Sequence, residues 1–202
     1  MERYDGKTKK DDYKKYALIA AGIILVIVLY KVITSVAYTL SHPTPDITVV
    51  VGCEAVIDFQ MEDEMELYLK EFATDLDGNG KVVVDLVPYD IRRNEAVDAS
   101  GVLEVGGWER FGASIENGDG VLYLMTRGTF SAKRSYANGD NCAALPEDLA
   151  PVEEPWCVEI TGCELLQEQG FGQAQFYGAI SKYATDQEYE LAVEILRQLK
   201  TK

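Results

Sequence analysis

The sequence contains a single histidine, His42, and this scarcity excludes most catalytic sites that depend on imidazole. A Ser-His-Asp or Cys-His site would have to be built around this one residue, and the metalloprotease motif HExxH requires two histidines. The nucleophile motifs GxSxG and SxxK are absent, as is the phosphate-binding loop GxxxxGK[ST]. Paired carboxylates remain as a catalytic arrangement that the composition permits, since 34 Asp and Glu residues are present.

Basic residues are also scarce. There are 19 Lys and Arg against 34 Asp and Glu, which gives a formal net charge of −15. Nucleic acid is therefore excluded as a partner, because phosphate binding needs a basic surface. The imbalance is greater over residues 42–202, which hold 12 basic and 30 acidic side chains. Such a surface repels anionic polymers and attracts divalent cations, although most of these carboxylates need only keep the domain soluble.

One long apolar segment occupies residues 17–40. Residues 17–30 carry no charge, and the apolar character resumes after Lys31. The segment has the roughly 20 residues that cross a bilayer, so we expect a transmembrane helix and a membrane as partner. The basic residues that precede it place residues 1–16 in the cytoplasm and the C-terminal part outside. These basic residues are Arg3, Lys7, Lys9, Lys10, Lys14 and Lys15.

Two alternatives to a permanent anchor stay open. The small residues of Ser35-Val36-Ala37 suit a signal-peptidase site, so the segment is also compatible with a cleaved signal peptide. A buried helix of a soluble protein is disfavoured, because no polar stripe divides the first fourteen apolar residues. With the anchor, the predicted organisation is a cytoplasmic tail (1–16), a transmembrane helix (17–40), a linker (41–46) stiffened by Pro43 and Pro45, and an exported acidic domain (47–202).

Strand and helix patterns alternate along the exported domain, and they predict one α/β sandwich with a largely parallel sheet. The run at 47–51 is apolar throughout, as a central strand covered on both faces would be. Pro88 either ends the strand at 82–87 or places it near an edge of the sheet. Asp186 is the expected cap of the last helix. We expect further strands at 121–125, 158–161 and 175–180, and helices at 60–74, 108–115 and 186–200.

Four cysteines, Cys53, Cys142, Cys157 and Cys163, all lie on the predicted exported side, where disulfides persist. A Cys142–Cys157 bridge would close the loop-rich middle of the domain and leave Cys53 to pair with Cys163. Two alternatives remain, a zinc site and a set of buried thiols. Zinc is disfavoured because no C-x-x-C spacing occurs and the single histidine lies next to the membrane segment.

The residues that follow the first predicted helix have the spacing of a calcium-binding loop. Asp75, Asp77 and Asn79 alternate as D-x-D-x-N and are followed by Gly80, as in the first half of an EF-hand loop. Lys81 would add its backbone carbonyl at the seventh position. The twelfth position is Leu86 rather than Glu, so the remaining carboxylate must come from elsewhere or be missing. The alternative interpretation is a metal-free turn from helix to strand.

The membrane segment, the strand DITVVV and the run DLDGNGKVVV together resemble membrane-anchored exported proteins of Gram-positive anaerobes that carry an acidic α/β domain. That domain is similar to a reduced lobe of an extracellular solute-binding protein. The D-x-D-x-N-G-K loop is similar to the loops of dockerins and EF-hands. This resemblance implies a fold and a location at the cell membrane rather than an activity.

Two functional classes follow from these observations. The first is a non-enzymatic binding or scaffold domain outside the membrane, with an envelope protein as its partner and calcium as its stabilising ion. The second is an extracellular hydrolase with a carboxylate-based site. The lack of histidine and of nucleophile motifs favours the first class. The exported part is large enough for only one lobe of a solute-binding protein, which argues against capture of a ligand between two lobes.

Overall fold

The computed structural model describes residues 16, 20–34, 44–54, 57–91, 95–97, 103–133, 138–150, 154–161 and 175–201. The chain divides into two compact units, Met1–Thr44 and Pro45–Lys202. This boundary lies within the predicted linker 41–46.

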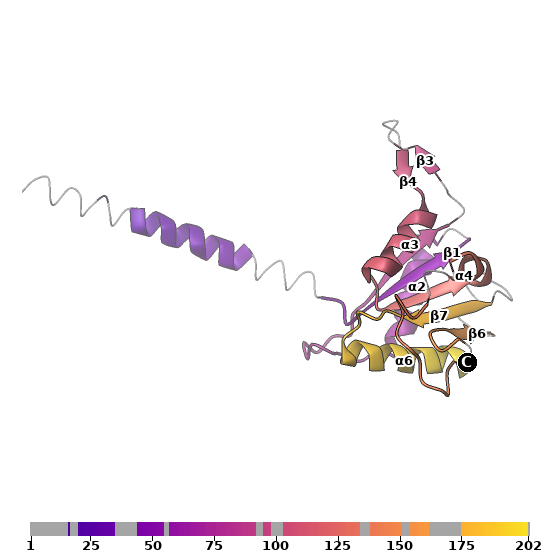
Figure 1. Cartoon of the computed structure of the whole chain (residues 1–202). Coiled ribbons are helices and arrows are strands. Elements are labelled where there is room, and N and C mark those ends of the chain that lie inside the picture. The colour runs from indigo at the N-terminus through magenta and orange to yellow at the C-terminus, as the bar shows by residue number, and fades with distance from the viewer. Residues whose placement is uncertain are drawn as a thin grey trace, which may run out of the picture. The chain divides into compact units, whose positions relative to one another are not determined.

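The described part of the first unit is a helix over residues 20–34, drawn in indigo in Figure 1. Its large apolar side chains are at least half exposed on every side, from Leu29 at 50% to Tyr30 at 68%. Within the described ranges, no helix is both long enough and apolar enough to cross a membrane. Residues 17–19 and 35–40 of the predicted transmembrane segment lie outside those ranges.

A five-stranded sheet in the order β2-β1-β5-β7-β6 forms the centre of the second unit (Figure 1). Its strands are β1 (Ile47–Cys53), β2 (Val84–Asp90), β5 (Leu122–Thr126), β6 (Val158–Ile160) and β7 (Phe176–Ile180). β1 pairs in parallel with both β2 and β5, whereas β7 runs antiparallel to both β5 and β6. The α/β class is therefore confirmed.

The prediction of a largely parallel sheet holds only at the β2-β1-β5 end, and the sheet as a whole is mixed. Apolar strands covered on both faces look alike in sequence whether they run parallel or antiparallel, so their pattern does not report direction. Of the two alternatives for Pro88, the edge position is confirmed, and Pro88 does not end the strand because β2 continues to Asp90. Pro88 lies within β2, which is the edge strand next to β1.

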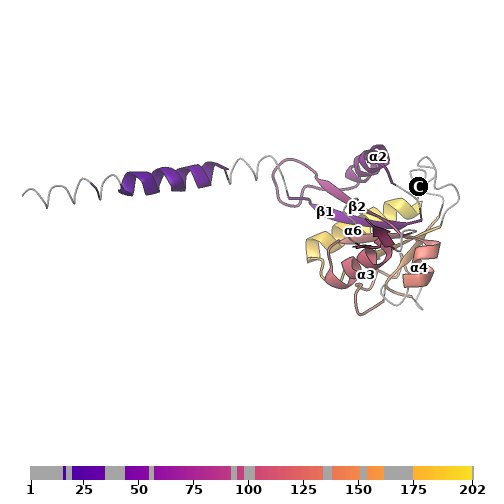
Figure 2. The same ribbon diagram turned by 90° about the horizontal axis from the view of Figure 1, so that it is seen from above.

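Helices cover both faces of this sheet, which makes a three-layer sandwich. One core packs α2 (Phe59–Lys70) and α6 (Asp186–Thr201) against β1 residues such as Val49 and Val51. The other core packs α3 (Gly107–Asn117) and Phe130 of α4 (Arg127–Lys133) against Val50. Figure 2 shows α2 and α3 on opposite sides of β1 and β2. The entirely apolar β1 run is thus explained by burial on both faces.

The helix ends follow from local hydrogen bonds. Asp58 caps α2 by accepting the Met61 N–H at 3.0 Å. The predicted cap of α6, Asp186, is wrong by one residue. Thr185 Oγ1 accepts the Glu188 N–H at 3.3 Å, and the Glu188 carboxylate accepts the Thr185 N–H at 2.7 Å, which is a capping box. The sequence Thr185-x-x-Glu188 carried this signal, which the prediction overlooked.

Three elements were not expected from the sequence. They are the short helix α4 and the two-stranded antiparallel sheet of β3 (Glu95–Val97) and β4 (Leu103–Val105). Three-residue strands and a seven-residue helix are too short to produce a recognisable hydrophobic period.

Three of the four cysteines lie in the described part of the domain. Cys53, Cys142 and Cys157 are buried, and no disulfide joins any two of them, so the predicted Cys142–Cys157 bridge is absent from this structure. Cys163 lies outside the described residues, and the Cys53–Cys163 bridge stays a prediction. Cys142 and Cys157 pack with apolar side chains in the α3-side core, where a thiol is an adequate small apolar group. Burial raises the pKa of the Cys142 thiol to about 12, so that this sulfur is not a nucleophile at neutral pH.

Candidate metal centre

The loop between α2 and β2 is folded around the side chain of Asp75. Its Oδ1 accepts the N–H groups of Gly78 (2.7 Å) and Asn79 (3.1 Å), and its Oδ2 accepts that of Gly80 (2.6 Å). Gly80 has φ +81°, a left-handed conformation that suits glycine. The tight bend predicted at the sixth position of the loop is therefore present.

Asp77 and Asn79 form the second turn of this loop. Asp77 Oδ1 accepts the Asn79 N–H at 2.9 Å, and the Asn79 amide donates to Asp77 Oδ2 at 2.7 Å. Asn79 Oδ1 in turn accepts the Lys81 N–H at 2.8 Å. The alternating side chains thus hold the loop by hydrogen bonds to its own backbone N–H groups.

A third aspartate, Asp46, closes the loop from the start of β1. It is 4% exposed, and its two oxygens accept the N–H groups of Leu76 (2.7 Å) and Val83 (2.8 Å), one on each side of the loop. The Asp46 N–H also donates to the Val83 carbonyl at 2.8 Å. Asp46 therefore joins the beginning of β1 to both ends of a loop that lies about 30 residues further along the chain.

One carboxylate oxygen from each of Asp46, Asp75 and Asp77 lies within 4.8 Å of the other two. Asp46 is buried, Asp75 is half-buried and Asp77 is exposed, so the cluster is open to solvent on one side. Two oxygens bound to the same calcium ion lie at most about 5 Å apart, so oxygens within 4.8 Å of one another are compatible with a shared ion. The three aspartates are therefore able to hold a metal ion.

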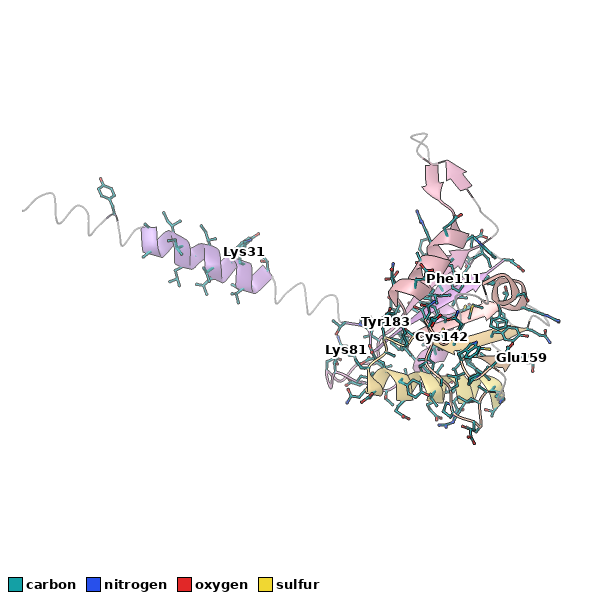
Figure 3. All side chains as sticks on the ribbon, viewed as in Figure 1. Lys31, Lys81, Phe111, Cys142, Glu159 and Tyr183 are labelled. Carbon is teal, nitrogen blue, oxygen red and sulfur yellow. The ribbon has the colours of Figure 1, made fainter. Side chains whose placement is uncertain are left out.

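The sequence predicted four of the residues around this centre and missed the fifth. Asp75, Asp77, Asn79 and Lys81 lie on the loop as expected, although the Lys81 side chain is exposed and only its N–H is seen bound within the loop. Lys81 is labelled in Figure 3. Leu86 is buried in β2 and its side chain offers no ligand atom, and the third carboxylate of the cluster is that of Asp46. No local sequence motif predicts the role of Asp46, because its partners Leu76 and Val83 are distant in sequence.

A second group of acidic side chains lies between α2 and β2 and consists of Glu62, Glu66 and Asp85. Burial, followed by the charge of Glu66, raises the pKa of both Glu62 and Asp85. Glu66 accepts the Leu86 N–H at 3.3 Å and pairs with Lys70 at 3.4 Å, so it is held near Asp85. These carboxylates repel one another in the folded state.

We expect an Asp85→Asn variant to be more stable than the parent at pH 7, by a few tenths of a kcal/mol, because it removes a like-charge contact. A raised pKa means that the folded domain binds more protons than the unfolded chain, so the parent gains stability as the pH falls below neutral. In Asp85→Asn the free energy of unfolding should rise less as the pH falls. Urea unfolding between pH 7 and pH 5 measures both effects. Asp119→Asn, at an exposed position outside this acidic group, is the control. An identical pH slope in the parent and in Asp85→Asn would contradict the interpretation.

Comparisons of this chain with protein-family models, with curated proteins and with solved structures returned no significant match.

Proposed function

We propose that the protein is a membrane-anchored extracytoplasmic binding domain whose fold is stabilised by calcium. The observation that carries this proposal is the convergence of Asp46, Asp75 and Asp77, whose oxygens come within 4.8 Å of one another from two separate parts of the chain. The absence of nucleophile motifs and the single histidine support a binding role over a catalytic one.

Calcium suits this centre better than a transition metal. All three candidate ligands are carboxylates, and oxygen ligands in a flexible arrangement are what calcium prefers. The set is smaller than the six to eight ligands of a complete calcium site, so water would fill the remaining positions. We expect weak binding, with a Kd of about 10⁻⁴ to 10⁻³ M, as in extracellular modules.

The ion would have a structural role rather than a signalling role. Sensor EF-hands respond to calcium by moving two helices apart. Here α2 leads into the loop but the strand β2 leads out of it, and Asp46 ties that loop to β1. An ion at this position would therefore fix α2 and β2 against the first strand.

We expect calcium to raise the melting temperature of residues 44–202 by a few degrees. At ten times Kd the gain is about 1.4 kcal/mol, because the ion binds the folded state only. Asp75→Asn and Asp77→Asn should abolish the calcium-induced shift. Thermal unfolding with millimolar calcium, with magnesium and with chelator measures it.

Asp63→Asn is the matched control, since Asp63 is an exposed aspartate on α2 outside the centre. It should keep the full calcium-induced shift. Identical melting of the parent with calcium and with chelator would show that the loop is only a turn.

The exposed helix over residues 20–34 supports the proposal that this segment anchors the protein in a membrane. A helix whose apolar side chains are exposed on all sides has no polar face to turn toward water, and it is stable when apolar surroundings cover it. The basic residues before this segment support an orientation with the N-terminus inside and the acidic domain outside.

Protease added to protoplasts of a Gram-positive host that express the full chain should remove the acidic domain and leave a membrane-bound N-terminal fragment. Immunoblotting with tags at both ends follows the two parts, and a cytoplasmic protein that stays intact controls for lysis. Protection of the domain would contradict the orientation. Release into the medium with a new N-terminus near Tyr38 would instead show a cleaved signal peptide.

A further inference from the structure

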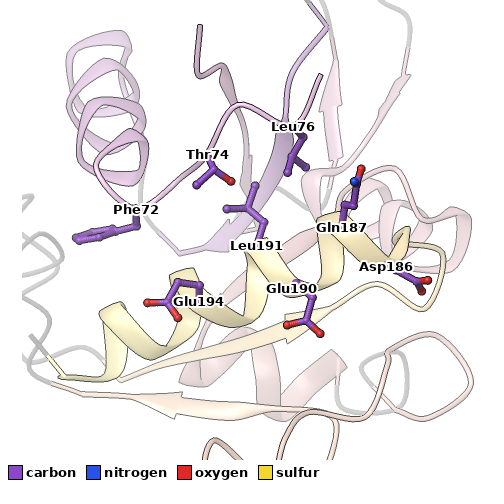
Figure 4. A pocket seen from close by; sticks show the side chains of 8 residues that line it. All are labelled: Phe72, Thr74, Leu76, Asp186, Gln187, Glu190, Leu191 and Glu194. Carbon is purple, nitrogen blue, oxygen red and sulfur yellow. The ribbon is translucent and has the colours of Figure 1, made fainter. Parts of the chain in front are cut away.

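A groove of about 460 Å³ lies between α6 and the chain segment 72–76 (Figure 4). Its apolar lining consists of Phe72 and Leu76 on one side and Leu191 of α6 on the other. Leu191 is almost fully buried, whereas Phe72 and Leu76 are half-buried. The groove therefore has an apolar lining, of which Phe72 and Leu76 are partly accessible to solvent.

The α6 side of the groove carries a row of three carboxylates, Asp186, Glu190 and Glu194. They are four residues apart, so that each step along the helix is about 6 Å. Figure 4 shows them in line along α6, across from Thr74 and Leu76. All three acids are exposed, and no basic residue lines the groove.

These carboxylates are largely unneutralised. Asp186 makes no ion pair with any residue of the described ranges, whereas Glu190 interacts with the charge of Arg197 without forming a close ion pair. Glu194 lies 3.8 Å from Arg197, but Arg197 is engaged more closely by Asp148 at 2.9 Å. The groove thus combines an apolar floor with a negative wall, which is complementary to a ligand that is both basic and apolar.

We propose that this groove binds an extended peptide segment in which basic residues alternate with apolar residues. Side chains on one side of an extended chain recur every two residues, about 6.6 Å, which is close to the 6 Å spacing of the carboxylates. The basic side chains would face α6, and the alternate apolar side chains would face Phe72 and Leu76. This inference rests on the proposed function only in taking the domain to be a binding module, and it does not require calcium.

The test uses the full chain in a non-ionic detergent and a fluorescent heptapeptide, Lys-Leu-Lys-Leu-Lys-Leu-Lys, with binding followed by anisotropy at low salt. Asp186→Asn/Glu190→Gln should weaken binding at least about fivefold, since it removes two exposed ion pairs. Thr74→Lys, which places a competing cation at the rim, should weaken it to a similar extent. Glu109→Gln/Glu116→Gln on α3 is the matched control and should change binding by less than about twofold.

Two further ligands test whether the alternating order of the residues and the apolar side chains are needed for binding. A peptide of the same composition with its four lysines in one block should bind at least about fivefold more weakly. Spermine, a polyamine without apolar side chains, should fail to displace the alternating peptide at equal concentration. Equal binding of the block peptide, displacement by spermine, or equal loss in the α3 control would each overturn the proposal.

The calcium-induced melting shift is measured on the same preparation. A normal shift with no peptide binding would refute the groove and leave the calcium centre standing. Peptide binding without a shift would refute the calcium centre and leave the groove standing.

Discussion

An Asp46→Ala variant is expected to lose about 2–4 kcal/mol of unfolding free energy, even in the presence of chelator. The buried carboxylate accepts two N–H groups, those of Leu76 and Val83. Its removal leaves both donors unsatisfied, at about 1–3 kcal/mol each, and water that enters the open side of the loop recovers part of this loss. Urea unfolding followed by circular dichroism measures the change.

Asp75→Ala is the comparison for this experiment. Asp75 accepts three N–H groups of the same loop, but Gly78, Asn79 and Gly80 are exposed, so water replaces the lost acceptor. We expect a loss of about 1 kcal/mol for Asp75→Ala in chelator. An Asp46→Ala variant no less stable than Asp75→Ala would show that Asp46 does not tie the loop to β1. Asp46→Asn keeps one acceptor oxygen and should fall between the two.

Phe111→Ala is expected to cost about 3–5 kcal/mol, the largest loss among the variants considered. The Phe111 ring is fully buried and lies against Gly52 of β1, and it is labelled in Figure 3. A Cβ added at Gly52 would lie 2.7 Å from two ring atoms, so Gly52→Val should itself cost about 1–3 kcal/mol.

The double variant Gly52→Val/Phe111→Ala should lose less than the sum of the two single variants, because the valine fills space that the ring vacates. Denaturant unfolding of the four proteins gives the coupling energy, which we expect to be about 1–3 kcal/mol. Met65→Ala is the control, since Met65 is buried on the other face of the sheet and should combine additively with Gly52→Val. Additive losses for Gly52→Val and Phe111→Ala would contradict direct packing.

The parts of the fold that depend on neighbours in sequence were predictable. The run at 47–51 indicated a strand buried on both faces, and β1 is such a strand. The D-x-D-x-N spacing placed Asp75 and Asp77 in one loop, because side chains two residues apart bind the same few backbone groups.

The parts that depend on distant residues were not predictable. Asp46 looks like the end of a linker, and its role follows only from the parallel pairing of β1 with β2, which brings residue 83 beside it. The direction of β7 is likewise a property of the assembled sheet, since the pattern of Phe176–Ile180 would serve either direction. The apolar groove along α6 arises because residues 72–76 lie beside that helix. The hydrophobic pattern of either segment alone does not predict this contact.

The position of Asp46 has a mechanical consequence. The compact unit begins at Pro45, so any tension transmitted along the chain from the N-terminal side enters the domain at Asp46, before the first residue of β1. Asp46 distributes that load at once to Leu76 and Val83, on both sides of the loop. A cation held there would stiffen this attachment point, so that pulling strains the loop before it peels the first strand from the sheet.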